Sequence, residues 1–144
     1  MEIIANRRIY TPNNSRFSGL IEKLWTHSLS CVFSAEFIIN LLHLRLDQDA
    51  FTLGSTHDIG KLVLIQVIGK LERKGRLIQR IETDKLINTL EAYHEKFGAV
   101  LLKRWWFNSV FRDVAMYHDY FESVKEYSQE YICVHFTKSF SQYP

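Results

Sequence analysis

The two prolines of this chain stand at its margins, and little between them interrupts a helix. Pro12 and Pro144 are the only prolines in 144 residues, and six glycines are scattered between the ends. Since proline and glycine mark turns, their scarcity favours long helices over many short strands. A hydrophobic content of 47% excludes a disordered chain. We therefore expect an all-α protein with a single compact bundle, because this length supports one core but not comfortably two.

Apolar residues recur at steps of three and four along five segments, which predicts a bundle of about five helices. The predicted helices cover about residues 16–45, 57–73, 83–106, 108–121 and 125–140. Residues 1–15 are predicted to be an irregular lead-in to a domain over 16–144. Residues 47–56 are predicted to be a connector, and residues 76–82 a short helical turn.

Two of these helices begin at residues typical of caps. Thr83 or Asp84 is expected to cap the third helix, and Asn108 or Ser109 the fourth. The buried face of the third helix is predicted to carry Ile87, Leu90, His94, Phe97 and Leu101.

Histidines fall on the predicted buried faces. His27, His94 and His118 lie on the apolar stripes of three separate helices, and His57 precedes Asp58. A buried ring nitrogen without a partner costs about 1–3 kcal/mol, and a shared metal or a shared hydrogen-bond network satisfies several at once. Imidazole and carboxylate suit zinc, manganese or iron in bundle cores. The five residues are the candidate metal ligands, although each histidine alone is typical of an ordinary core residue.

Two further histidines carry weaker signals. His43 is expected to be a surface or cap residue at the end of the first helix. His135 lies in the last helix, near the place where a further ligand would be needed, and is either a site residue or a bystander.

Charge and cysteine content limit the partners. A net charge of +2 is too small to indicate nucleic acid by itself. The basic cluster of the chain is either a solvated helix face or a phosphate contact; it comprises Lys70, Arg73, Lys74, Arg76 and Arg80. Cys31 and Cys133 show no disulfide spacing, which predicts reduced thiols in a cytoplasmic protein. Residues 1–10 lack the apolar core of a secretory signal, and residues 31–46 are too short and polar to span a membrane.

Four segments together resemble the HD superfamily, and more closely the HDOD domain of bacterial signalling proteins. They are Leu24-Trp25-Thr26-His27-Ser28, His57-Asp58-Ile59-Gly60-Lys61-Leu62-Val63-Leu64, His94-Glu95-Lys96-Phe97-Gly98-Ala99-Val100-Leu101-Leu102 with Arg104-Trp105, and Tyr117-His118-Asp119. Their order and spacing agree with the family over about residues 20–140. The resemblance implies an all-helical fold, with metal-dependent phosphohydrolases or phosphodiesterases among the catalytic HD proteins. HDOD domains, by contrast, are regulatory modules with degenerate sites.

The sequence departs from the catalytic pattern at three places. The late aspartate that the family implies as a ligand is absent from residues 134–138, Tyr117 replaces the first histidine of a usual pair, and no Gly-Tyr-Pro follows the fourth helix. The helical half that precedes the Trp-x-His-Ser segment in the family is also absent, which indicates a fragment or a short member.

The favoured hypothesis is therefore a non-catalytic signalling or protein-interaction module without a resident cofactor. The alternative is a metal-dependent phosphohydrolase or phosphodiesterase that acts on a nucleotide or phosphodiester and holds Zn, Mn, Fe or Mg. In that enzyme Asp58 is catalytic, and Lys61 either contacts a substrate phosphate or lies on the helix surface. Lys138 is a candidate for a cation that replaces the metal beside Asp58.

A protein partner is expected, a homo-oligomer is an option, and membrane or nucleic-acid binding is not expected. The aromatic residues near the end of the third helix and after the fourth either form the partner interface or belong to the core; they are Trp105, Trp106, Phe107 and Tyr120.

Overall fold

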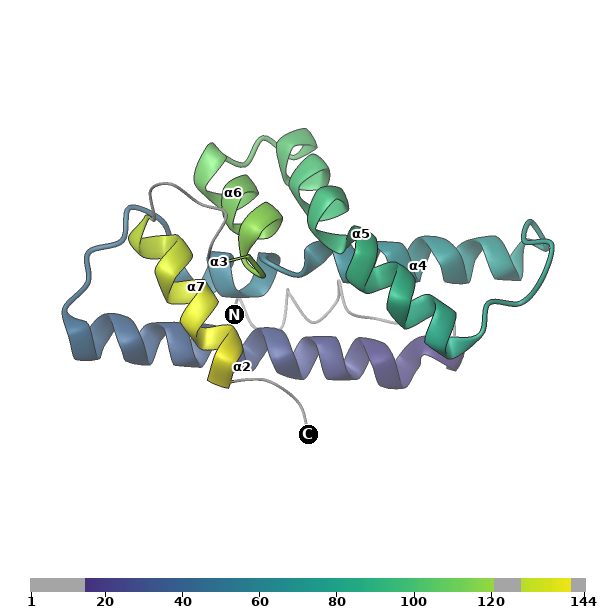
Figure 1. Cartoon of the computed structure of the whole chain (residues 1–144), viewed down its shortest axis with the longest axis horizontal. Helices are drawn as coiled ribbons and strands as arrows, with labels where there is room; N and C mark the ends of the chain where they lie inside the picture. Colours follow the sequence, from purple (N-terminus) through teal and green to yellow (C-terminus); the bar gives the residue numbers. More distant parts are fainter. Residues whose placement is uncertain (1–14, 121–127, 141–144) are drawn as a thin grey trace.

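The computed structural model describes residues 15–120 and 128–140, with side chains over residues 16–120 and 128–137. Its elements are η1 (Ser15–Phe17), α2 (Ser18–Leu42), α3 (Ala50–Thr56), α4 (Ile59–Arg73), α5 (Thr83–Arg104), α6 (Ser109–Tyr117) and α7 (Gln129–Phe140). No strand occurs in the described ranges, so the all-α prediction is confirmed. Figure 1 shows α2 running along the molecule, with α7 against its C-terminal half and α5 crossing α4.

The prediction of a connector over residues 47–56 is wrong, because this stretch contains α3. The Asp49 side chain caps the helix by accepting hydrogen bonds from the Thr52 backbone nitrogen at 2.7 Å and its hydroxyl at 2.6 Å. Such a cap satisfies an amide that the first turn leaves unpaired. This short helix packs on α2.

Other boundaries differ at helix ends. His43 adopts a left-handed conformation with φ of 51° and ends α2 before the predicted residue 45. It is exposed, as expected for a surface or cap residue. Glu82 precedes α5, so the prediction of Thr83 or Asp84 as the cap is wrong, whereas Asn108 does cap α6. Residues 76–82 are not helical.

Parts of the predicted lead-in and of two predicted helices lie outside the residues that the structure describes. These are residues 1–14 of the lead-in, Phe121, and residues 125–127 of the last helix.

None of the described helices combines the length and the hydropathy that crossing a membrane requires. The basic cluster at the end of α4 and in the loop after it is exposed.

The buried face of α5 is shifted from the predicted one. Leu90 and His94 are buried as predicted, but Ile87 and Phe97 are 40% and 50% exposed. Gly98 lies on the buried face instead and packs beside Gly60 of α4. A β-carbon at Gly60 would collide with the carbonyl oxygen of His94, so the glycine permits the close approach of α4 and α5.

Candidate metal centre

His57 and Asp58 form the junction between two helices. His57 follows the last residue of α3 and Asp58 precedes the first residue of α4, whereas the sequence predicted a helix beginning at His57. The carboxylate of Asp58 therefore projects from a junction at the centre of the bundle. It is 3% exposed.

All five predicted ligands meet around this carboxylate. Oδ2 of Asp58 lies 3.4 Å from Nε2 of His27 and 3.5 Å from Nε2 of His57. Oδ1 lies 3.5 Å from Nε2 of His94 and 3.3 Å from Nε2 of His118. One carboxylate thus stands between two pairs of imidazoles. Of the four histidine side chains, that of His27 is the most exposed, at 7%.

Three of the histidines are held in one tautomer by their own helical turns. Each Nδ1–H donates to a backbone carbonyl, in the pairs His57 with Gly54 (2.8 Å), His94 with Leu90 (2.9 Å) and His118 with Val114 (3.2 Å). The lone pair of each ring is then on Nε2, which faces Asp58. Backbone support of this kind orients histidines that bind metals.

The donor set fits a divalent metal. Among the described residues, neither carboxylate oxygen of Asp58 nor Nε2 of His94 forms a hydrogen bond. Lone pairs that face one another across the centre require a proton or a cation between them. Two ligands each about 2.1 Å from a tetrahedral zinc ion lie about 3.4 Å apart, close to the distances around Asp58. Nitrogen-rich coordination suits zinc or iron better than magnesium or manganese.

Electrostatics keep Asp58 ionised. Burial alone would raise the pKa of its carboxyl, but the neighbouring His57, His118 and His27 and the charge of Lys61 hold the pKa well below the usual value. Burial lowers the pKa of His94, which favours the neutral imidazole that a metal needs.

Lys61 is not a solvated helix-surface lysine, so that interpretation is wrong. Its side chain is 12% exposed, and Nζ lies 3.4 Å from Oδ2 of Asp58 and 3.3 Å from Oε1 of Glu91. Burial opposes its charge, but the two carboxylates outweigh burial and raise the pKa of Lys61. The structure thus places the ammonium of Lys61 beside Asp58. The side chain of Lys138, predicted for that role, lies outside the described residues, and its role stays a prediction.

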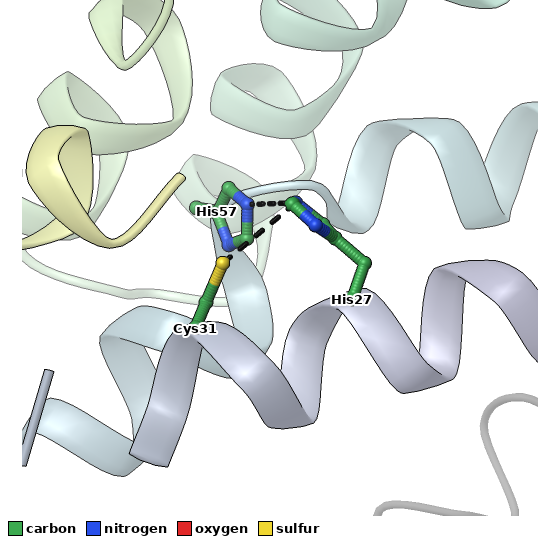
Figure 2. A group of neighbouring side chains, drawn as sticks. All are labelled: His27, Cys31 and His57. Atoms are coloured by element: carbon green, nitrogen blue, oxygen red, sulfur yellow. Dashed lines mark hydrogen bonds between the residues drawn. The ribbon is translucent and has the colours of Figure 1, made fainter. Parts of the chain in front are cut away.

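Sequence reasoning missed Cys31 as part of this centre. Figure 2 shows Cys31 and His27 projecting from α2 toward His57. Sγ of Cys31 lies 3.7 Å from Nε2 of His27. Burial raises the pKa of the thiol, but His27 and His57 outweigh it and lower the pKa to about 5. For His27 the directions are reversed. Burial lowers the pKa of this imidazole, but Asp58 and Cys31 outweigh burial and raise the pKa to about 9.

A second carboxylate was also missed. Oδ2 of Asp119 lies 3.5 Å from Nε2 of His94, and Oδ1 lies 3.4 Å from Nε2 of His118. Asp119 directly follows His118 at the end of α6, as Asp58 follows His57 at the end of α3. This repeated His-Asp pair is the signal that locates it, and it supplies a carboxylate although the late aspartate is absent.

His135 contacts the backbone of the candidate ligand His118. Its Nδ1 donates a hydrogen bond of 2.9 Å to the carbonyl oxygen of His118 and so supports the end of α6. The residue is half-buried.

Comparison with known proteins agrees with this arrangement. The HDOD domain family matches residues 4–121, a range that includes every residue of the centre from His27 to Asp119. No curated protein and no solved structure gives a match. Because the family match covers most of the chain, the chain belongs to the HDOD domain family, a signalling-type branch of the HD superfamily.

Proposed function

We propose that this chain is a non-catalytic signalling domain that holds a divalent metal in a closed His/Asp centre and acts through a protein partner. One observation carries the proposal: the predicted ligand side chains are at most 7% exposed. A catalytic metal keeps an open position for water or substrate, whereas a structural metal is enclosed by protein ligands. The burial of these donors therefore favours a metal that stabilises helix packing.

A phosphohydrolase remains the second candidate, and one observation favours it. Asp119 is 19% exposed and Lys61 is 12% exposed, so the centre is most accessible beside these two residues. A metal polarises a phosphoryl oxygen and lowers the pKa of bound water. In such an enzyme Lys61 would hold a substrate phosphate beside the metal.

Metal analysis combined with a turnover assay separates the two functions. Protein purified without chelator is expected to contain stoichiometric metal and to leave a generic phosphodiester intact after loading with zinc or manganese. The variant Asp58→Ala is expected to lose the metal. Turnover by the wild type that Asp58→Ala abolishes would overturn the non-catalytic function and establish the hydrolase.

The protein-interaction part of the proposal rests on an exposed apolar stripe of α2. Phe33, Phe37 and Leu41 are 58%, 66% and 62% exposed, and their spacing of four residues places them on one helix face. Apolar faces of this kind on soluble domains serve protein interfaces. Of the aromatic residues predicted for the interface, Trp105, Trp106 and Tyr120 are exposed, whereas Phe107 packs against the core.

A second copy of the chain is the first partner to test. Light scattering over a concentration series is expected to show self-association that Phe37→Asp abolishes. Asn88→Asp adds the same charge at an exposed position of α5, a different helix, and is the matched control. Equal masses for all three proteins at every concentration would remove this stripe as a self-association surface.

A further inference from the structure

We propose that Cys31 is a metal ligand of this centre, and that its thiolate, with His27 and His57, holds a zinc-class ion against Oδ2 of Asp58. The inference rests on the proposed function, since it requires that the centre hold a metal. It adds a sulfur ligand and a class of metal.

The geometry of α2 brings the thiol to the histidines. Cys31 follows His27 by four residues, so both side chains lie on one face of the helix. Sγ lies 3.7 Å from Nε2 of His27, which lies 3.2 Å from Nε2 of His57. The ligand atoms of these three residues all lie within 4.8 Å of one another. A tetrahedral zinc ion bound at about 2.1 Å by nitrogen and about 2.3 Å by sulfur separates two nitrogens by about 3.4 Å, and a nitrogen from a sulfur by about 3.6 Å.

Asp58 points independently to a cation at the same place. Its Oδ2 lies 3.4 Å from Nε2 of His27 and 3.5 Å from Nε2 of His57. The side chain is 3% exposed, and neither oxygen forms a hydrogen bond within the described residues. The ammonium of Lys61, 3.4 Å from Oδ2, offsets part of the cost of this buried charge, but it leaves the ring nitrogens that face the carboxylate without a cation to bind. With Cys31, the residues provide two imidazoles, a thiolate and a carboxylate, which is a complete set for a four-coordinate ion.

A sulfur ligand changes which metal the site prefers. Thiolate favours zinc and other soft or borderline ions, while magnesium and manganese prefer oxygen ligands. Four protein ligands also leave no position for water, as in structural zinc sites. Cys31 therefore gives the centre both its selectivity and its closed coordination.

A thiol that only hydrogen-bonds to His27 would also account for a distance of 3.7 Å. The experiment must therefore detect a bond between sulfur and metal. Cobalt(II) is a suitable probe, because it occupies zinc sites and its thiolate complexes absorb in the near ultraviolet by charge transfer from sulfur.

Wild type, Cys31→Ser and Cys133→Ser are each titrated with cobalt(II) and then with zinc. Cys133 is the matched control, because it is the only other cysteine and is equally buried. Its thiol donates a hydrogen bond to the carbonyl oxygen of Ala35. Wild type and Cys133→Ser are expected to show the charge-transfer band, and zinc is expected to remove it. Cys31→Ser is expected to lack the band and to bind zinc at least about 100-fold more weakly, since it loses a direct ligand.

A band that persists in Cys31→Ser, or cobalt binding by the wild type without the band, overturns the inference. Zinc-edge X-ray absorption of the zinc-loaded wild type needs no variant and decides the matter if Cys31→Ser does not fold. One sulfur at about 2.3 Å supports the ligand, and a shell of nitrogen and oxygen alone refutes it. The inference and the proposed function fail separately: phosphodiester turnover contradicts the non-catalytic function but leaves a sulfur ligand intact. Binding of neither metal refutes both the inference and the metal-holding part of the proposed function, whereas a metal bound without sulfur refutes the inference alone.

Discussion

The centre consists of two halves that share one carboxylate but differ in their donors. The thiolate half comprises His27, Cys31 and His57, from α2 and the end of α3. The carboxylate half comprises His94, His118 and Asp119, from α5 and the end of α6. Asp58 directs Oδ2 to the first half and Oδ1 to the second.

The two halves differ in softness and in access to solvent. The thiolate half is buried throughout, whereas Asp119 of the carboxylate half is 19% exposed. A soft, closed set is typical of a structural ion, and a harder, more accessible set is typical of an exchangeable one. Under the proposed function, we therefore expect the thiolate half to hold one ion permanently and the carboxylate half to bind a second ion that exchanges.

The variant Asp58→Asn tests whether the shared carboxylate supports both halves, and we expect it to have the largest effect. It removes the anionic donor of each half, so metal affinity should fall by well over about 100-fold at both. Competition with a chromogenic chelator measures this loss. Asp113→Asn removes an exposed carboxylate from α6 and should change nothing. Loss at only one half would show that Asp58 does not bridge them.

Gly60→Ala tests whether close packing of α4 on α5 holds the halves together. The added methyl group would overlap the carbonyl of His94, so the free energy of unfolding should fall by about 3 kcal/mol. Denaturant unfolding measures it. Gly19→Ala is the matched control, since nothing lies within 4 Å of its β-carbon position, and it should be neutral or stabilising. Equal stability of the two variants would contradict the close approach.

Asp119→Asn should weaken only the carboxylate half. An amide keeps the shape of the side chain but loses its charge, and we expect about a 10-fold weaker second metal with the first unchanged. Zinc titration calorimetry separates the two steps. A change in the tighter step instead would assign Asp119 to both halves.

The sequence identified some of the residues that meet at the centre and overlooked others, for reasons that differ by residue. His27, His94 and His118 were recognisable because each is a polar residue on an apolar stripe. Cys31 was not, because a cysteine on such a stripe looks like any small apolar core residue. Its position four residues after His27 is the signal that distinguishes it.

Helix packing explains the remaining differences. The stripe predicted for α5 followed hydrophobicity, but the contact with α4 requires a small residue, so Gly98 faces inward and Phe97 outward. The helix α3 was hidden because only a seven-residue segment is helical, and its strongest signal is the Asp49 cap. Contacts between helices and short capped segments are weakly encoded in periodicity.

The pH dependence of the metal-free protein probes the thiolate half alone. Burial raises the pKa of the Cys31 thiol, but contact with His27 and His57 outweighs burial and lowers this pKa from 9.0 to about 5. A group whose pKa is lowered by folding stabilises the fold above its unfolded pKa, and this contribution is lost as the pH falls through the folded pKa. The stability difference between wild type and Cys31→Ser should thus be largest near pH 9 and shrink toward pH 5.

Two controls have different pH windows, because their pKa values are raised. Despite burial, Asp58 and Cys31 raise the pKa of His27 to about 9, so the difference between wild type and His27→Gln should shrink as the pH rises from 6.5 to 9. Burial raises the pKa of Cys133 to about 11, so the contribution of Cys133 should stay constant between pH 5 and 9 and fall only above that range. Urea unfolding in the presence of a chelator measures all three. If the Cys31 and Cys133 variants showed the same pH profile, the thiolate would have no special place beside His27, and the distinction between the halves would rest on Asp119 alone.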